Sequence, residues 1–302
     1  MAITAAMVKE LRDMTGAGMM DCKKALNETN GNMEEAVDFL RKNGQAKAEK
    51  KAGRIAAEGL CKVIVEDNVA AMVEVNSETD FVAKNAEFQG FVELVAKQAL
   101  TTESADIDAF LAEAWKEDSS KTVKDALVEK IAVIGENLSI RRFTKVVPAN
   151  GCVVSYTHGG GRIGVIVEAE ADSVNDAIKE ALTNIAMQVA ALSPKYVSPE
   201  DVSEEYKQHE LEILMAQAKG DPKNANKPDN IIEKMVTGRL NKELKEVCLT
   251  EQAYVKAEDG KQTVGQYVAQ VSKECGVDFK IKQFVRFETG EGLEKKNEDF
   301  AA

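Results

Sequence analysis

The chain carries Gly59-Leu60-Cys61-Lys62-Val63-Ile64-Val65 and repeats the pattern as Gly151-Cys152-Val153-Val154-Ser155-Tyr156. Glycine followed by β-branched and apolar residues is typical of the start of a strand. A turn and a second apolar strand follow each stretch, at residues 70–75 in the first copy and 163–167 in the second. Such self-similarity indicates a duplicated unit, so we expect two related β-hairpins that decide the fold.

Each hairpin leads into a helix and then into a closing strand. Phe88 begins one apolar stripe and Ile178 begins the other, both with the three-and-four spacing of a helix that buries one face. The closing strands follow Gly135 and Gly276. Helices that cover small antiparallel sheets define the α+β class. The sequence therefore predicts a duplicated α+β core, with one antiparallel-sheet subdomain at 59–147 and a second at 148–192 and 248–288.

The second copy contains an insertion. The hairpins start 92 residues apart, whereas the closing strands start 141 apart, so 49 residues are extra, and they fall within 193–247. Residues 204–219 and 231–247 have helical patterns, and the loop 220–228 separates them. Two antiparallel helices joined in this way form a helical hairpin. It can serve contacts or pack onto its parent domain, and the sequence leaves both options open.

The first 44 residues predict a module of three short helices. Thr4 is a good N-cap for the first helix, and Asn30-Gly31-Asn32 ends the second and caps the third. The third is expected to end at Asn43-Gly44. Residues 45–58 are basic, and we interpret them as a linker or solvated helix in preference to a dedicated basic contact.

The charge of the chain favours a protein partner. The 302 residues include 39 basic and 51 acidic side chains, a net charge of -12. Residues 1–54 hold ten basic and eight acidic residues, so they carry +2 and the remainder carries -14. A net acidic body argues against nonspecific nucleic-acid binding, so no direct nucleic-acid contact is expected. No apolar run suits a membrane helix and no secretory signal is visible, so we expect a cytoplasmic protein without membrane contact.

The sequence offers little material for catalysis. Two histidines, His158 and His209, and five scattered cysteines without a Cys-x-x-Cys pair favour neither a metal site nor a disulfide framework. The odd number of cysteines fits reduced, buried thiols. No nucleophile, base and orienting group are visible as a set. We therefore expect no catalytic residues, no metal site and no cofactor.

The stretch Thr79-Asp80-Phe81-Val82-Ala83-Lys84 lies between a predicted strand and a predicted helix. Such corners often display binding groups. The residues by themselves allow a blander interpretation, in which Ser77 and Asp80 form a capping box and Phe81, seven residues before Phe88, joins the buried helical stripe. Similarly, the glycines after His158 favour a hairpin turn over a phosphate-binding loop, because the Lys-Ser/Thr ending and following helix are missing.

Five motifs, taken together and in order along the chain, resemble the translation elongation factor Ts family. They are TGAGMMDCKKAL at 15–26, TDFVAKN at 79–85, IGEN at 134–137, HGGGRIG at 158–164 and GEG at 290–292. The first two are highly specific. The resemblance implies a guanine-nucleotide exchange factor for the GTPase elongation factor Tu. It also implies a ubiquitin-associated-like N-terminal module, a duplicated core and an inserted coiled-coil hairpin, and it leaves room for a dimer of heterodimers.

The resemblance also implies partner-binding residues. Asp80 and Phe81, with Thr79 and Val82 beside them, would enter the partner's nucleotide domain and dislodge its Mg²⁺. Further contacts are implied for Lys9, Arg12, Met19, Met20, Ile134, Gly135, Glu136 and His158. The residue types alone equally suit other roles: Met19 and Met20 a helical core, Lys9 and Arg12 a solvated face, and Gly135 a helix C-cap.

Two departures from the family and one rival function remain at this stage. Ser77 stands where family members often have Cys, and members frequently continue into a longer C-terminal helix than the module expected at 289–302. The rival is a ubiquitin-like-binding adaptor built on the N-terminal module. It predicts that the module alone suffices for partner binding, whereas exchange requires the core and Phe81.

Overall fold

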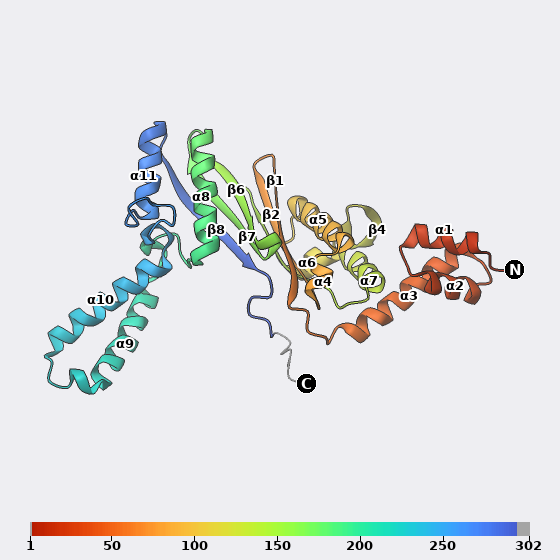
Figure 1. Ribbon diagram of the computed structural model, residues 1–302, viewed down its shortest axis with the longest axis horizontal. Coiled ribbons are helices and arrows are strands. Elements are labelled where there is room, and N and C mark those ends of the chain that lie inside the picture. The colour runs from red at the N-terminus through yellow and green to blue at the C-terminus, as the bar shows by residue number, and fades with distance from the viewer. Residues whose placement is uncertain (1, 295–302) are drawn as a thin grey trace.

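The computed structural model of the protein describes residues 2–294. Figure 1 shows an elongated molecule, with a helical module at the N-terminal end, two sheets in the middle and a helical hairpin at the far end. No helix of the described residues is long and apolar enough to cross a bilayer. The predicted α+β class is confirmed.

The two central sheets are copies of one another. The first orders its strands β1 (Glu58–Glu66), β2 (Val69–Ser77) and β5 (Ser139–Val146), all antiparallel. The second orders β6 (Cys152–His158), β7 (Ile163–Ala171) and β8 (Phe279–Glu288) in the same way. Each central strand shifts register just after a buried glutamate, Glu74 in β2 and Glu168 in β7. The duplication predicted from the hairpins therefore extends to an irregularity in the strands.

A long helix covers one face of each sheet. Helix α5 (Ala86–Thr101) begins at the N-cap Asn85, and α8 (Asp176–Leu192) begins at the N-cap Asn175. Each helix turns its apolar stripe onto its own sheet and forms a separate core. The opposite faces of the two sheets meet across a smaller cluster made of Cys61, Ala70, Met72, Val146, Val153, Ile166 and Phe287. The two subdomains thus share an apolar interface.

Each copy completes its core with different elements. The first adds α6 (Ile107–Ala112), the short strands β3 (Ala114–Trp115) and β4 (Asp118–Thr122), and α7 (Val123–Ile134). The second adds α11 (Val264–Cys275) and the 3₁₀ turns η2 (Pro199–Asp201) and η4 (Leu249–Glu251). The two copies share one polar contact. The buried side chain of Gln98 hydrogen-bonds the backbone of residues 114–116, and that of Gln188 hydrogen-bonds the backbone of residues 253–255; each donates to a carbonyl and accepts from an N–H group.

The N-terminal module consists of α1 (Ala5–Thr15), α2 (Met19–Glu28) and α3 (Met33–Lys51). The predicted end of the third helix at Asn43-Gly44 is wrong, because α3 runs on to Lys51. Gly44 lies inside the helix where it approaches α7, and a Cβ at Gly44 would stand 3.5 Å from the Cβ of Ala132. Ala48 is buried in the first core. The basic segment is therefore neither a free linker nor a fully solvated helix, since its apolar face packs on α7.

The inserted segment forms the predicted hairpin, which we call the arm. Its helices are α9 (Glu204–Gly220) and α10 (Asp229–Val247), joined through the 3₁₀ turn η3 (Pro222–Asn224). The arm has a core of its own, with Leu214, Ile232, Val236 and Leu240 buried between the two helices. Figure 1 shows that it extends away from the sheets beyond α11, so it projects instead of packing along the parent domain.

The remaining predictions concern the cysteines and the C-terminal module. All five cysteines are free, and Cys22, Cys61, Cys152 and Cys248 are buried as expected, whereas Cys275 is half-buried. Of the predicted C-terminal module only residues 289–294 are described, as a turn after β8, and residues 295–302 lie outside the described part.

The separate core of the arm leads to a first prediction. If residues 208–241 are replaced by a short Gly-Ser linker that spans the roughly 8–10 Å between packed helices, the two sheets should remain folded. We expect the free energy of unfolding of the sheet cores to change by less than about 1 kcal/mol, because no side chain of either core is removed. Urea denaturation followed by Trp115 fluorescence measures this change. A loss of more than about 3 kcal/mol would show that the arm supports the sheets.

Candidate functional site

The candidate site is the strand-to-helix corner formed by residues 77–84. Strand β2 ends at Ser77, and a four-residue helix, α4 (Asp80–Ala83), follows before the chain turns into α5. The predicted capping box is wrong: the N-cap is Thr79, whose hydroxyl accepts a 3.3 Å hydrogen bond from Val82 N. Ser77 instead donates its hydroxyl proton to the Thr79 carbonyl. The cap therefore lies one residue before the acid and aromatic pair.

Phe81 does not join the buried stripe that its spacing to Phe88 allowed. Its side chain is 81% exposed, whereas Phe88 is fully buried. The break between α4 and α5 explains the difference, because a seven-residue spacing places two side chains on one face only within a continuous helix. Val82 packs against the first core and Ala83 is buried, so the last two residues of α4 anchor the corner while Phe81 is displayed.

Asp80 is displayed beside Phe81 and is paired within the corner. Lys84 Nζ lies 2.6 Å from Asp80 Oδ2, an i,i+4 pair on the surface. The hydrogen bond from Lys84 is the main cause that lowers the pKa of Asp80 below its ordinary value. Asp80 is therefore a carboxylate at neutral pH and presents its charge together with a matching cation.

The corner is held from the far end of α7 by Glu136. Its Oε2 accepts hydrogen bonds from the backbone N–H groups of Glu78 and Thr79, each at 3.1 Å, and its Oε1 accepts the Thr79 hydroxyl at 2.7 Å. Glu78 reciprocates, because its Oε1 accepts from Asn137 N at 2.7 Å. The turn after α7 and residues 78–79 before α4 are thus joined by hydrogen bonds to two carboxylates, those of Glu136 and Glu78.

The other residues of this turn also have internal roles. Gly135 is the C-cap of α7, with φ of 86° in the left-handed region, and its carbonyl accepts a hydrogen bond from Lys51 of α3. Ile134 is half-buried against the first core. Of the residues predicted as secondary contacts, Ile134, Gly135 and Glu136 are therefore engaged within the molecule, and their contact with a partner stays a prediction.

The N-terminal module presents the other predicted group of contacts. Met19 and Met20 begin α2 and are 59% and 77% exposed, so their assignment to a helical core is wrong. The core of the module is made instead by Val8, Leu11, Cys22, Ala25, Leu26 and Ala36. Lys9 and Arg12 are exposed on α1. Exposed methionines are suited to contact with an apolar partner surface.

His158 occupies a third place in the fold. It is exposed at the end of β6, and its Nδ1 lies 3.0 Å from the hydroxyl of Tyr156. The glycines that follow form a 3₁₀ turn, η1 (Gly159–Gly161), between β6 and β7, which confirms the hairpin turn. Glu136 contacts the corner, whereas His158 belongs to the second sheet and Met19 and Met20 to the N-terminal module.

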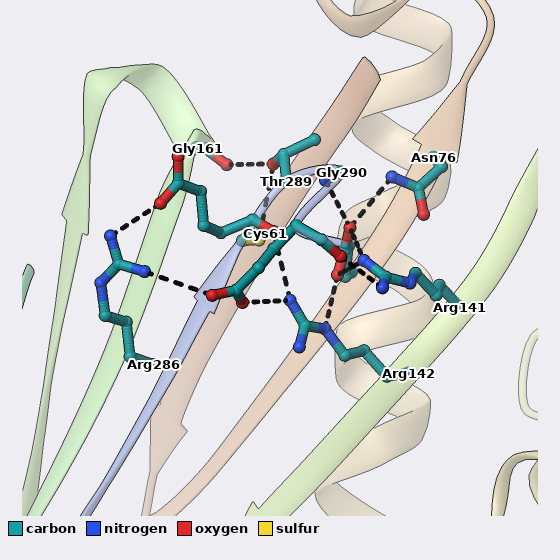
Figure 2. Close-up of polar contacts among 11 residues, drawn as sticks. Cys61, Asn76, Arg141, Arg142, Gly161, Arg286, Thr289 and Gly290 are labelled. Atoms are coloured by element: carbon teal, nitrogen blue, oxygen red, sulfur yellow. Dashed lines mark hydrogen bonds and ion pairs between the residues drawn. The ribbon is translucent and has the colours of Figure 1, made fainter. Parts of the chain in front are cut away.

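Strand β2 carries a buried charged residue, Glu74, three residues before the corner, and its role was not predicted from the sequence. Glu74 is fully buried and accepts hydrogen bonds from Arg141, Arg142, Asn76 and the backbone N of Gly290, which we call the Glu74 cluster. Figure 2 shows both arginines reaching toward this group from one side and the Thr289-Gly290 turn from the other. An acid in the middle of the apolar run 70–75, with two adjacent arginines on the closing strand, was the signal that could have revealed it.

The Glu74 cluster connects the first sheet to the turn after β8. Arg142 Nε lies 2.5 Å from Glu74 Oε2, and its Nη2 donates to the Glu288 carbonyl and lies 3.3 Å from Glu291 Oε2. The turn fits closely, because a Cβ at Gly290, where φ is +73°, would meet the carbonyl oxygen of Ala57 at 2.2 Å. The GEG motif at 290–292 therefore holds the two sheets in a fixed relation.

No group of three or more His, Cys, Asp or Glu side chains within 2–294 is arranged to hold a metal ion. A cleft of about 670 Å³ lies between the N-terminal module and α7. Its Lys121 is paired with Asp118 and Glu129. The Cys61 thiol is buried, which raises its pKa to about 11 and makes it a poor nucleophile.

Comparisons with known proteins agree on one family. The family model described as Elongation factor TS matches residues 78–291. The chain is 56% identical to Elongation factor Ts of Clostridioides difficile (strain 630) over 301 residues, which cover 99% of this chain and 96% of the relative. It is 51% identical to Elongation factor Ts of Clostridium tetani, over 99% and 97% of the two chains. The protein of that name from Trichlorobacter lovleyi is 50% identical over 308 residues, 100% and 97%.

The Glu74 cluster leads to a prediction about stability. Replacing Glu74 by Ala should lower the free energy of unfolding at pH 7 by about 3 to 5 kcal/mol, because it leaves two arginines without their buried partner. Urea denaturation of the intact chain measures the loss. Glu103→Gln is the control, since this glutamate is 92% exposed in its pair with Lys145 and should matter by less than about 1 kcal/mol.

The same variant should show a defined pH dependence. Burial by itself would raise the pKa of Glu74, but the hydrogen bonds from Gly290 and Asn76 and the charge of Arg142 outweigh it, so the pKa is lowered. A lowered pKa stabilises the folded state above the ordinary glutamate value of about 4.3, and this contribution disappears as the pH falls through the folded-state pKa. The difference between wild type and Glu74→Ala should therefore shrink below pH 4.3. A difference that stays constant down to pH 2 contradicts this assignment.

Proposed function

The chain belongs to the elongation factor Ts family, and we propose that it is a guanine-nucleotide exchange factor that binds elongation factor Tu with GDP and accelerates release of the nucleotide. The single observation that carries the proposal is the display of Phe81 at a rigid corner, 81% exposed, with the Asp80 carboxylate beside it. An exposed aromatic side chain contributes little to the stability of the free chain, but it contributes strongly to binding when a partner buries it. The reaction would take place in the cytoplasm, where translation proceeds.

The proposed mechanism is competition without mimicry of the nucleotide. A GTPase holds GDP through backbone N–H groups around the phosphates and through Mg²⁺, so any displacement of these elements weakens the nucleotide. Phe81 would insert between helices of the partner, and Asp80 would disturb the region that organises the Mg²⁺. Thr79 and Val82 would complete the contact as the cap and anchor of the same short helix. No covalent bond is made or broken, so no catalytic base is needed.

The ion pair at the corner is suited to this insertion. An isolated carboxylate loses hydration when it enters an interface, and that loss opposes binding. Lys84 lies 2.6 Å from Asp80, so the two charges can enter together and the desolvation cost is smaller. In the complex the carboxylate can exchange Lys84 for a partner of its own. The proposal thus assigns Lys84 to the presentation of Asp80.

Thermodynamic linkage sets what the exchange factor must do. If the chain weakens GDP binding by a given factor, GDP must weaken binding of the chain by the same factor. A coupling of about 3 to 4 kcal/mol corresponds to a change of about 10² to 10³ in affinity. The further contacts, through Met19, Met20, Lys9 and Arg12 on the N-terminal module and His158 on the second sheet, would supply affinity that does not depend on the nucleotide. Contacts of this kind keep the partner bound while the corner acts.

Phe81→Ala tests the central step. We expect the rate of GDP release at saturating exchange factor to fall by about tenfold or more, with less than about a threefold loss in affinity for the nucleotide-free partner. The reason is that one inserted side chain is a small share of a large interface and acts mainly on the bound nucleotide. Stopped-flow release of a fluorescent GDP from elongation factor Tu measures the rate at each concentration.

Val147→Ala is the matched control, because Val147 is also an exposed apolar residue and lies in the loop between the two sheets. It should release GDP at the wild-type rate. If a folded Phe81→Ala chain accelerates release as well as wild type, the corner is not the acting element and the proposed mechanism is wrong.

The N-terminal module should show the opposite pattern. Met20→Ala is expected to raise the half-saturating concentration of the chain by about fivefold and to leave the release rate at saturation nearly unchanged. The control is Met14→Ala, since Met14 is also exposed but lies at the end of α1 beside the cleft to α7. The same stopped-flow titration separates the two quantities. A drop in the saturating rate alone would place Met20 in the release step instead of in docking.

A further inference from the structure

We propose that Glu136 is a positioning residue that sets the cap of α4 and thereby fixes Asp80 and Phe81 in the orientation from which they act. The inference rests on the proposed exchange function, and it assigns to Glu136 a role inside the molecule instead of at the partner's surface. It starts from the three hydrogen bonds that the Glu136 carboxylate accepts from Glu78 N, Thr79 N and Thr79 Oγ1.

The first step concerns the single proton of the Thr79 hydroxyl. A hydroxyl donates one hydrogen bond and accepts others through its lone pairs. Thr79 donates this proton to Glu136 Oε1 at 2.7 Å, which leaves the oxygen lone pairs for Val82 N at 3.3 Å. Without the carboxylate the hydroxyl could turn its proton elsewhere and leave Val82 N uncapped. Glu136 therefore fixes the direction of the Thr79 hydroxyl proton, and with it the lone pairs that accept the hydrogen bond from Val82 N.

The second step concerns the size of α4. A helix of four residues is too short to persist by its own hydrogen bonds, because the cost of nucleation exceeds what one turn returns. Phe81 is exposed and cannot anchor it, and within residues 2–294 the only ion pair of Asp80 is the one with the surface residue Lys84. The order of the corner must come from its ends. Val82 and Ala83 hold the far end in the core, and Glu136 holds the near end.

The third step concerns the rigidity of Glu136 itself. It follows the C-cap Gly135, whose carbonyl accepts from Lys51, and it precedes Asn137, whose N–H is bound by Glu78. Asn137 Nδ2 also donates to the Arg54 carbonyl at 2.8 Å. The turn is thus fixed by α3, α7 and the segment before β1 at once. A carboxylate on so well supported a turn can transmit its position to the corner.

Charge and geometry together exclude most replacements. The carboxylate faces three donors and offers acceptors to all of them. A glutamine of the same length could keep its carbonyl oxygen on the two backbone N–H groups, but its N–H₂ group would then donate to the Thr79 hydroxyl, which would have to turn its own proton away. Asp would be one methylene too short to reach both backbone groups. Glu136→Gln therefore removes the charge and reverses the hydrogen bond to Thr79 with little change in volume. It is a better test than Ala, which would also open space.

The experiment uses the full chain and two readouts. In the first, hydrogen exchange of the free protein is followed for the peptide that spans residues 78–84. We expect Glu136→Gln to speed exchange there by about tenfold, as for loss of a charged hydrogen-bond acceptor, with the peptides of α5 unchanged. In the second, release of fluorescent GDP from elongation factor Tu is titrated. We expect the rate at saturation to fall by about tenfold and the half-saturating concentration to change by less than about threefold.

Two further variants complete the design. Thr79→Val keeps the shape and removes the hydroxyl, so it should act in the same direction, and the double variant with Glu136→Gln should lose less than the product of the two single losses. Glu258→Gln is the charge-matched control at an exposed glutamate of the second subdomain, and it should behave as wild type. Thermal unfolding verifies that each chain is folded.

The outcomes separate this inference from the function it rests on. If wild type does not accelerate GDP release, the proposed function fails, and hydrogen exchange still decides whether Glu136 orders the corner. If wild type is active and Glu136→Gln releases GDP at the wild-type rate, Glu136 is not a positioning residue. A loss confined to the half-saturating concentration, or losses that multiply in the double variant, would overturn it as well, because Glu136 would then act by direct contact or independently of Thr79.

Discussion

The burial of the Glu74 carboxylate constrains how the two sheets and the turn after β8 are arranged. A charge removed from water must be paired and hydrogen-bonded, and Glu74 satisfies this with two arginines from β5, an amide from β2 and a backbone N–H from the turn after β8. Because these partners come from the first sheet and from the turn after β8, the cluster fixes the first sheet relative to the end of the second. Strand β2 runs from Glu74 to Ser77, where the corner begins, so the same cluster sets the base from which Phe81 is displayed.

The duplication explains why the second sheet also contains a buried glutamate, although this glutamate has weaker partners than Glu74. Glu168 occupies the matching place in β7 and pairs with Gln283 and Lys282 of the closing strand, as Glu74 pairs with Arg142 and Arg141. Two neutral or flexible donors stand where the first copy has two guanidinium groups. The buried glutamate of the first copy therefore accepts more hydrogen bonds, whereas Glu168 Oε1 accepts none from the described part of the chain, and the first copy is the one that carries the corner. Arginine suits such a role because its donors are fixed in a plane.

The corner combines a rigid base with an exposed tip. Its order comes from polar contacts at Thr79 and apolar contacts at Val82 and Ala83, while Phe81 is left to solvent. Binding loses less entropy when the inserting group is already held in place, so a preorganised tip gives more of its contact energy to the partner. This arrangement is consistent with a site that needs no catalytic groups, because its proposed effect depends on where Asp80 and Phe81 are held.

The duplicated hairpins, the inserted arm, the α+β class and the family motifs could all be predicted from the amino-acid sequence, because strand alternation, helical spacing and repeats are local patterns that one chain displays. The same patterns left Phe81 and Met20 undecided between core and surface, and the packing of the folded chain settles both. A spacing of seven residues buries Phe81 beside Phe88 in one continuous helix and exposes it when the helix breaks between them. The grip of Glu136 on Thr79 joins groups 57 positions apart, and no local pattern encodes such a contact. Likewise, α3 passes through Gly44 because α7 packs against it there, a contact that the composition of residues 43–44 could not reveal.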